Sequence, residues 1–166
     1  MLISVAASVV FTLATREILG FAGYAVAFAL LAVFIGIGII FDVIGVAVTA
    51  ATEAPFHSMA AHRERGAAES LRLIKNAHKV SSFCNDVVGD ITGIVSGSTA
   101  ALIAARLLER LDTGNLLIPL MISGAVTGLM VGGKAAGKTI AINNSTAIVL
   151  RTGKLINTLR LKPNKK

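Results

Sequence analysis

The sequence predicts an all-α integral membrane protein with three to four transmembrane helices. Of its 166 residues, 54% are hydrophobic and only 15% are charged, which is more apolar surface than one soluble core of this length can bury. The apolar residues form long stretches, each near the roughly 20 residues that cross a bilayer. A bundle of such helices uses the whole chain, so no second soluble domain is expected and the function has to lie within the bundle.

The basic residues indicate how the helices are oriented. The chain carries 16 Lys and Arg against 9 Asp and Glu, a formal charge of +7. Most of the positive charge lies in one connector and in the tail: Arg63, Arg65, Arg72, Lys75 and Lys79, then Arg151, Lys154, Arg160, Lys162, Lys165 and Lys166. The positive-inside rule places both segments in the cytoplasm of a multi-pass protein of the cell membrane. The basic residues are not interleaved with aromatics, so the expected partner is the lipid bilayer and not a nucleic acid.

The first apolar stretch runs from Leu2 to about Leu19 and is interrupted by Arg16 and Glu17. We expect residues 1–20 to form an additional apolar helix that either spans the membrane or lies in its interface. No basic start and no small-residue cleavage site precede a polar region, so we expect this segment to be retained and not removed as a signal peptide.

The second stretch runs from Phe21 to about Ala54 and is interrupted only by Asp42 and Glu53. As one helix it exceeds the roughly 30 Å thickness of the hydrocarbon layer, so it has to tilt, bend or project. Pro55 follows, and because proline lacks a backbone N–H group, we expect the helical path to change direction there.

Two amphipathic segments are predicted on the cytoplasmic side. His57–Lys79 mixes charged and apolar residues, as in a helix or helical hairpin lying against the membrane, with Gly66 as the expected break. Ser145–Leu161 predicts a second amphipathic helix. Residues 156–166 form a basic cytoplasmic tail.

The third and fourth spans are predicted at about Val80–Leu108 and Leu116–Ile142, joined by the polar extracytoplasmic loop Glu109–Asn115. Small residues recur every four positions in both, a spacing that lets helices approach closely in lipid. They are Gly89, Gly93 and Gly97, and Gly124, Gly128 and Gly132. These faces pack either within the chain or between two copies of it, and both alternatives stay open.

Six ionisable residues lie inside the predicted spans, where each costs a few kcal/mol and needs a partner, a cavity or a bound ion. They are Asp42, Glu53, Asp86, Asp90, Lys134 and Lys138. Asp86 and Asp90 are four residues apart on one helix, so their negative charges require a neighbouring cation. Ion pairing with the equally spaced Lys134 and Lys138 is the purely structural interpretation.

The order of the spans predicts that Glu53, Asp86 and Lys134 converge in the inner half of the membrane. Oxygen-bearing side chains accompany them, among them Thr49, Thr52 and Asn85. Hard oxygen ligands without cysteine favour magnesium or calcium. The four acids and two lysines leave a formal charge of −2, which one divalent ion or protonation can neutralise.

Other chemistry-bearing residues receive structural interpretations. His57, His62 and His78 show no metal-ligand spacing and are expected at the surface, and Cys84 is expected to be buried. Gly132–Thr139 matches the phosphate-binding pattern GxxxxGK[ST], but no strand precedes it, so no nucleotide is expected. No nucleophile, base and orienting group occur together, so an enzyme is not expected.

Three short motifs in register resemble the transmembrane (DUF21) domain of the CorB/CorC and CNNM (cyclin M) magnesium-transport family. They are Ala50-Ala51-Thr52-Glu53, Cys84-Asn85-Asp86 and Gly133-Lys134-Ala135-Ala136-Gly137-Lys138-Thr139. The likeness covers about residues 36–155, within a domain of residues 21–155. The family's larger members add nucleotide-sensing CBS domains, which this sequence lacks, so we expect any such regulation to come from a separate protein.

The resemblance implies a homodimeric transporter or exporter of a Mg²⁺-type divalent cation. The expected metal-facing residues are Glu53, Asn85, Asp86, Asp90, Thr52 and Thr49, and the expected hinges are Pro55, Gly132, Gly133 and Gly137. Lys134 stands where the family has glutamate, so Lys134 and Lys138 are interpreted as built-in counter-charges. The alternative is a membrane scaffold or regulatory subunit in which Asp–Lys pairs replace the ion site.

Overall fold

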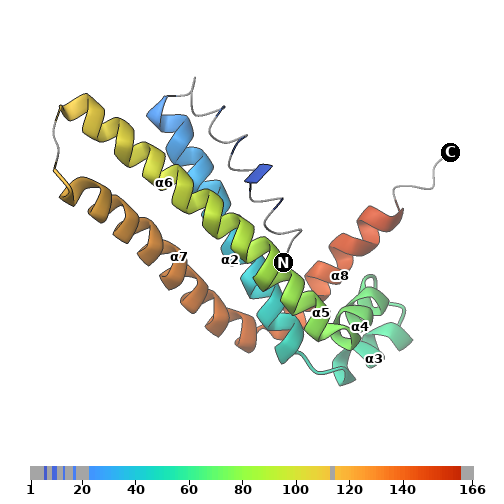
Figure 1. The fold of residues 1–166 in the computed structure, drawn as a ribbon. Coiled ribbons are helices and arrows are strands. Elements are labelled where there is room, and N and C mark those ends of the chain that lie inside the picture. The colour runs from blue at the N-terminus through green and yellow to red at the C-terminus, as the bar shows by residue number, and fades with distance from the viewer. Residues whose placement is uncertain are drawn as a thin grey trace. The chain divides into compact units, whose positions relative to one another are not determined.

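The computed structural model describes residues 23–112 and 115–161, together with Ala6, Val9, Val10, Leu13 and Glu17. These residues form helices and connecting turns, and no strand occurs among them. Three helical segments in this described part are long and apolar enough to cross a membrane: α2 (Tyr24–Ala50), the continuous run Ala77–Leu111, and α7 (Leu117–Asn143) (Figure 1). The all-helical prediction is therefore confirmed for the described residues, with three candidate spans among them. Most of the additional helix predicted over residues 1–20 lies outside the described residues.

Shorter helices connect and follow these spans. The run Ala77–Leu111 consists of α5 (Ala77–Ser82), the π-helical turn η1 (Phe83–Val88) and α6 (Gly89–Leu111). The connector contains α3 (Ala54–Ala61) and α4 (Ala67–Lys75), and α8 (Ser145–Leu161) has the bounds predicted for it. The chain divides into two compact units, residues 1–40 with 87–135 and residues 41–86 with 136–166.

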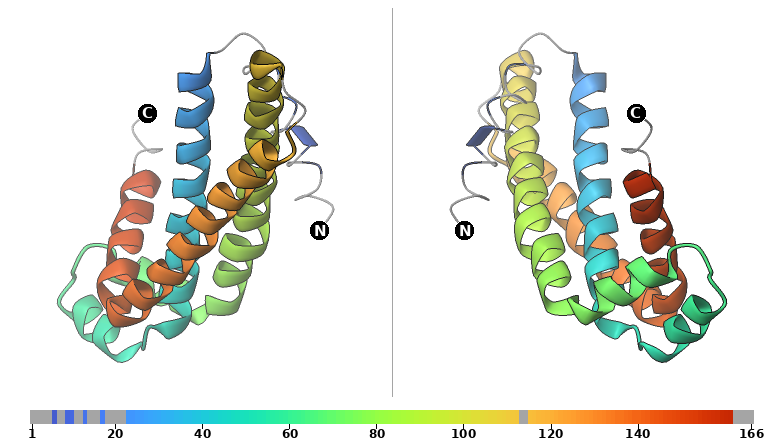
Figure 2. Two further views of the ribbon diagram at one scale, coloured as in Figure 1. Left: turned by 90° about the vertical axis from the view of Figure 1, so that its left-hand side faces the viewer. Right: turned by 90° about the vertical axis from the view of Figure 1, so that its right-hand side faces the viewer.

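The first unit is built from the N-terminal part of α2, from α6 and from most of α7, and α2 and α6 lie side by side in it (Figure 2). Its core is apolar: Ala27, Leu31, Ala100, Ile103 and Val126. A Cβ atom at Gly38 would lie 2.7 Å from Thr92 Oγ1, so the absence of a side chain lets α2 approach α6. The guanidinium of Arg110 lies 5.9 Å from the centre of the Tyr24 ring, within range of a cation–π interaction.

The second unit has its own core, formed by Ala47, Val48, Phe56, Ala141 and Val149. Within it α2 ends at Ala50, and α3 begins at Ala54 with Pro55 in its first turn. Proline is accepted there because the first N–H groups of a helix have no intrahelical partner. The expected change of direction near Pro55 is therefore a break between two helices, with residues 51–53 between them.

The connector breaks at Gly66, as predicted. Gly66 has a φ of +84°, which glycine adopts without a steric penalty, and it directly precedes α4. A Cβ atom there would lie 2.6 Å from the backbone nitrogen of Lys154 on α8. Gly153 is equally confined, because its Cβ atom would lie 2.5 Å from the carbonyl oxygen of Gly66. These two glycines allow α4 and α8 to cross in close contact (Figures 1 and 2).

The three glycines that recur every four residues in α7 are not packed in this way. Cβ atoms built at Gly124, Gly128 and Gly132 meet no other described atom within 4 Å. The prediction that the face with Gly124, Gly128 and Gly132 packs within the chain is therefore wrong for the part that the structure describes. Association between two copies stays a prediction.

Candidate functional site

The candidate site is centred on η1, the π-helical turn Phe83–Val88, which interrupts a span-length helix. It contains Asn85 and Asp86, two of the residues expected to face an ion. A π turn is rare and occurs frequently at functional sites. The sequence pattern does not predict this turn, because the residues on both sides of it are as apolar as those of an ordinary spanning helix.

Asn85 is half-buried, and its amide is oriented by one contact within its own helix. Nδ2 lies 3.3 Å from Ser81 Oγ and donates a hydrogen bond to it. The other amide atom, Oδ1, is buried and has no hydrogen-bond partner among the described residues. It faces α2, where a Cβ atom at Gly45 would lie 2.9 Å away. Gly45 therefore lets this carbonyl oxygen approach α2.

Asp86 is exposed, and its Oδ2 accepts a hydrogen bond from Ser82 Oγ. A carboxylate and a hydroxyl thus form an accessible polar pair on a helix that is otherwise apolar enough to span a membrane.

Glu53 is also exposed and belongs to the break between α2 and α3. Its Oε2 lies 3.3 Å from Nε2 of His57, which makes an ion pair when that imidazole is protonated. Thr52 lies beside it and is exposed. Thr49 donates a 2.8 Å hydrogen bond to the carbonyl oxygen of Val46, so its hydrogen is used within α2 while its oxygen keeps accepting capacity.

Asp90 and Lys134 belong to the first unit, where Asp90 is exposed and Lys134 is half-buried. Lys138 belongs to the second unit and is exposed. Among the described residues, no ion pair joins Lys134 to Asp90, and none joins Lys138 to Asp86. The ion pairs found there are His57–Glu53 and Lys154–Glu64. The predicted Asp–Lys pairs are therefore not formed within either unit, and convergence of all the charges in one layer stays a prediction.

No group of three or more His, Cys, Asp and Glu side chains is placed to hold a metal in residues 23–112 and 115–161 or at the five described positions before them. The carboxylates in this part of the chain therefore do not form a preformed acidic metal site. Asn85, Thr52 and Ser82 supply neutral oxygens beside individual acids instead.

The proposed hinge glycines lie inside a continuous helix. Gly132, Gly133 and Gly137 are all within α7, and a Cβ atom at Gly133 would press against the side chain of Ile39 in the first unit. The phosphate-like motif Gly132–Thr139 is part of the same helix. Its backbone N–H groups are therefore engaged in helical hydrogen bonds and do not form a phosphate-binding loop.

The sequence predicts Asp42 to be a charge within a span but does not predict it among the ion-facing residues. It is the one acid that is buried in the described part of the chain, with 7% of its surface exposed. Its Oδ2 has no hydrogen-bond partner among the described residues. The sequence shows an acid in a long apolar run, but it does not show that this side chain is buried.

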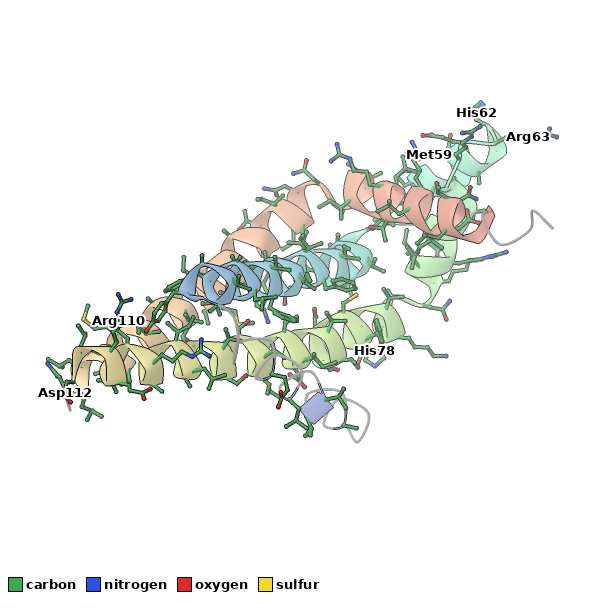
Figure 3. The ribbon with its side chains drawn as sticks, turned by 90° about the horizontal axis from the view of Figure 1, so that it is seen from above. Met59, His62, Arg63, His78, Arg110 and Asp112 are labelled. Atoms are coloured by element: carbon green, nitrogen blue, oxygen red, sulfur yellow. The ribbon has the colours of Figure 1, made fainter. Side chains whose placement is uncertain are left out.

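The charged surface of the second unit is formed by the connector and by α8. Arg63, Arg65, Arg72, Lys75, Lys79, Arg151 and Lys154 are exposed there. Figure 3 shows His62 and Arg63 pointing outward at the end of α3, and all three histidines are exposed, as predicted. Cys84 is buried, also as predicted.

Comparison of the chain with models of protein families, with curated proteins and with solved structures gives no match.

Proposed function

We propose that this chain is a multi-pass membrane protein that transports a divalent cation of the Mg²⁺ type. The observation that carries the proposal is the π-helical turn Phe83–Val88, which provides Asn85 and the exposed carboxylate of Asp86 in a helix of spanning length and composition. An ionisable group in such a helix is expensive unless it serves an ion or a polar pathway.

The oxygen chemistry of the second unit supports a hard cation. Glu53 and Asp86 are both exposed and provide carboxylates, while Thr52 and Ser82 provide hydroxyls beside them. Oxygen-only ligands of mixed charge suit Mg²⁺, which keeps several waters and needs few protein carboxylates. The motif resemblance to the CorB/CorC and CNNM family points to the same cargo.

The proposal includes an orientation and a partner. The exposed basic residues of the turn after α3, of α4, of α5 and of α8 favour the cytoplasmic side for the connector and the C-terminal helix. A second copy of the chain is the proposed partner, and its candidate contact is the glycine face of α7, with Gly124, Gly128 and Gly132, where an added Cβ atom would meet no described atom within 4 Å.

Magnesium flux into liposomes that contain the purified protein tests the proposal. The wild type is expected to carry Mg²⁺, and Asp86→Asn and Glu53→Gln are each expected to reduce the flux at least about tenfold, because each removes a charged oxygen ligand. Asp112→Asn is the matched control, since it removes an exposed carboxylate at the end of α6.

Equal flux from the wild type and both site variants would remove Glu53 and Asp86 from the transport site. A wild type that carries neither Mg²⁺ nor another divalent cation would instead favour the scaffold or regulatory subunit.

A further inference from the structure

Two buried oxygen atoms of the second unit lack hydrogen-bond partners among the described residues: Oδ2 of Asp42 and Oδ1 of Asn85. Asp42 is more than nine-tenths buried, at 7% exposure. A buried carboxylate without a hydrogen bond is costly, so an acid kept in this position needs a compensating partner.

Both oxygens can be located relative to Gly45, where η1 comes close to α2. Asn85 Oδ1 is close to α2 at Gly45, and the Cβ atom of Cys84 would lie 3.2 Å from a Cβ atom at Gly45. Asp42 precedes Gly45 by three residues and therefore lies on the same side of α2, one helical turn away. Both positions on α2 are buried. One carboxylate and one amide carbonyl oxygen, both buried and unpartnered in the described part of the chain, thus lie within one helical turn of the close approach at Gly45.

No basic side chain on these two segments can neutralise the carboxylate, because neither Tyr24–Ala50 nor Phe83–Val88 contains Lys, Arg or His. Asn85 does not donate to it either, because Asp42 Oδ2 has no hydrogen-bond partner among the described residues and Nδ2 of Asn85 donates to Ser81. The charge of Asp42 has therefore no partner on the two segments that form the contact.

We propose that Asp42 and Asn85 bind one small alkali-metal cation, Na⁺, between α2 and η1. One carboxylate and one neutral oxygen carry a single negative charge, which a monovalent cation neutralises, whereas a divalent ion leaves an uncompensated positive charge in a poorly hydrated region. The close approach at Gly45 favours Na⁺ over the larger K⁺. This site shares Asn85 with the proposed transport site but does not include the exposed acids Glu53 and Asp86, and it does not require that the chain transports a divalent ion.

Thermal unfolding of the full chain in detergent tests the proposal, with NaCl, KCl and N-methylglucamine chloride compared at one ionic strength. NaCl is expected to raise the Tm of the wild type above its value in the other two salts. Asp42→Asn is expected to abolish this difference, because it removes the charged ligand. Asp86→Asn is the matched control and is expected to keep it, because Asp86 is a neighbouring but exposed acid.

A second variant keeps the test decisive if Asp42→Asn does not fold. Asn85→Asp raises the charge of the site to −2, so Ca²⁺ is expected to replace Na⁺ as the stabilising ion. Equal Tm values of the wild type in all three salts would overturn the proposal and indicate a protonated Asp42. A sodium effect that survives in Asp42→Asn, that is lost in Asp86→Asn, or that is unchanged in Asn85→Asp would also overturn it.

Discussion

The hydroxyl of Ser70 lies 3.1 Å from the carbonyl oxygen of Val149 and 2.8 Å from that of Gly66, so a side chain of α4 is hydrogen-bonded to the backbone of α8. Ser70 is fully buried. Ser70, Gly66 and Gly153 are small enough to let the amphipathic connector pack closely against the C-terminal helix. Helices α4 and α8 are thus held together by a buried hydrogen bond.

Gly153→Ala is expected to destabilise the protein, because the new methyl group meets Ser70 and the carbonyl oxygen of Gly66. Overpacking of this kind costs about 1–3 kcal/mol. Chemical unfolding in detergent followed by circular dichroism measures it. Gly36→Ala is the control: no described atom lies within 4 Å of its added methyl, and alanine favours a helix interior. Equal stability of both variants would show that α4 and α8 do not cross at Gly153.

Phe56→Ala is expected to lower the free energy of unfolding by about 3–5 kcal/mol, since it leaves a cavity in an apolar core. Phe56 is fully buried among Ala47, Val48, Ala141 and Val149. Phe28→Ala removes the same ring from a side chain that is 53% exposed, and its effect in the same unfolding assay should be much smaller. A similar loss in both would contradict the core described for the second unit.

The predicted orientation can be tested with an impermeant maleimide, because Cys84 is the chain's single cysteine and is buried. In a Cys84→Ser background, Asp112→Cys should be labelled in intact cells. Arg63→Cys should be labelled only after the cells are made permeable, because the basic connector is predicted to be cytoplasmic. Labelling of both positions from the same side would refute this topology.

If Lys134 is the counter-charge that the motif resemblance implies, Lys134→Glu is expected to increase magnesium binding about tenfold, near 1.4 kcal/mol, because it removes an ammonium group that repels the metal. Flux in liposomes and Mg²⁺ titration measure the effect. Lys75→Glu, an exposed charge reversal on α4, serves as the control. If binding and flux are unchanged in Lys134→Glu, Lys134 is not a counter-charge of the transported ion.

Gly128→Ile should weaken self-association if the glycine face of α7 is the contact between two copies. A branched side chain keeps helices apart where glycine lets them approach, so the dissociation constant is expected to rise about tenfold or more. Energy transfer between labelled chains in liposomes reports it. Leu129→Ile changes the neighbouring exposed position without adding bulk. Unchanged transfer in Gly128→Ile would place the contact elsewhere or indicate a monomer.

Much of the helical plan was predictable, because long apolar runs and the break at Gly66 depend on local chemistry. The bounds of α8 followed from an amphipathic pattern between Asn144 and the basic end. The break after Ala50 was expected as a bend, since Pro55 is the only local signal and it lies inside the next helix, not at the interruption.

The site was less predictable, because burial and hydrogen bonding depend on neighbours distant in sequence. Asp42 and Asp86 look alike as acids in apolar runs, yet one is buried without a hydrogen bond and the other is exposed beside Ser82. The close approach of Asn85 to Gly45 joins residues forty positions apart in sequence. The hydrophobic periodicity of one helix does not predict a contact with another helix.

The π turn also determines how this span is to be aligned with other membrane helices. It contains one residue more than an α turn, so the positions after Val88 are displaced by about 100° from where an unbroken α-helix would place them. Ser81 lies before the turn and Thr92 after it, so the two residues cannot be placed on one helical-wheel projection. A one-residue gap within Phe83–Val88 is the physically correct gap in an alignment of this segment, and an ungapped comparison assigns one half of the span to the wrong face.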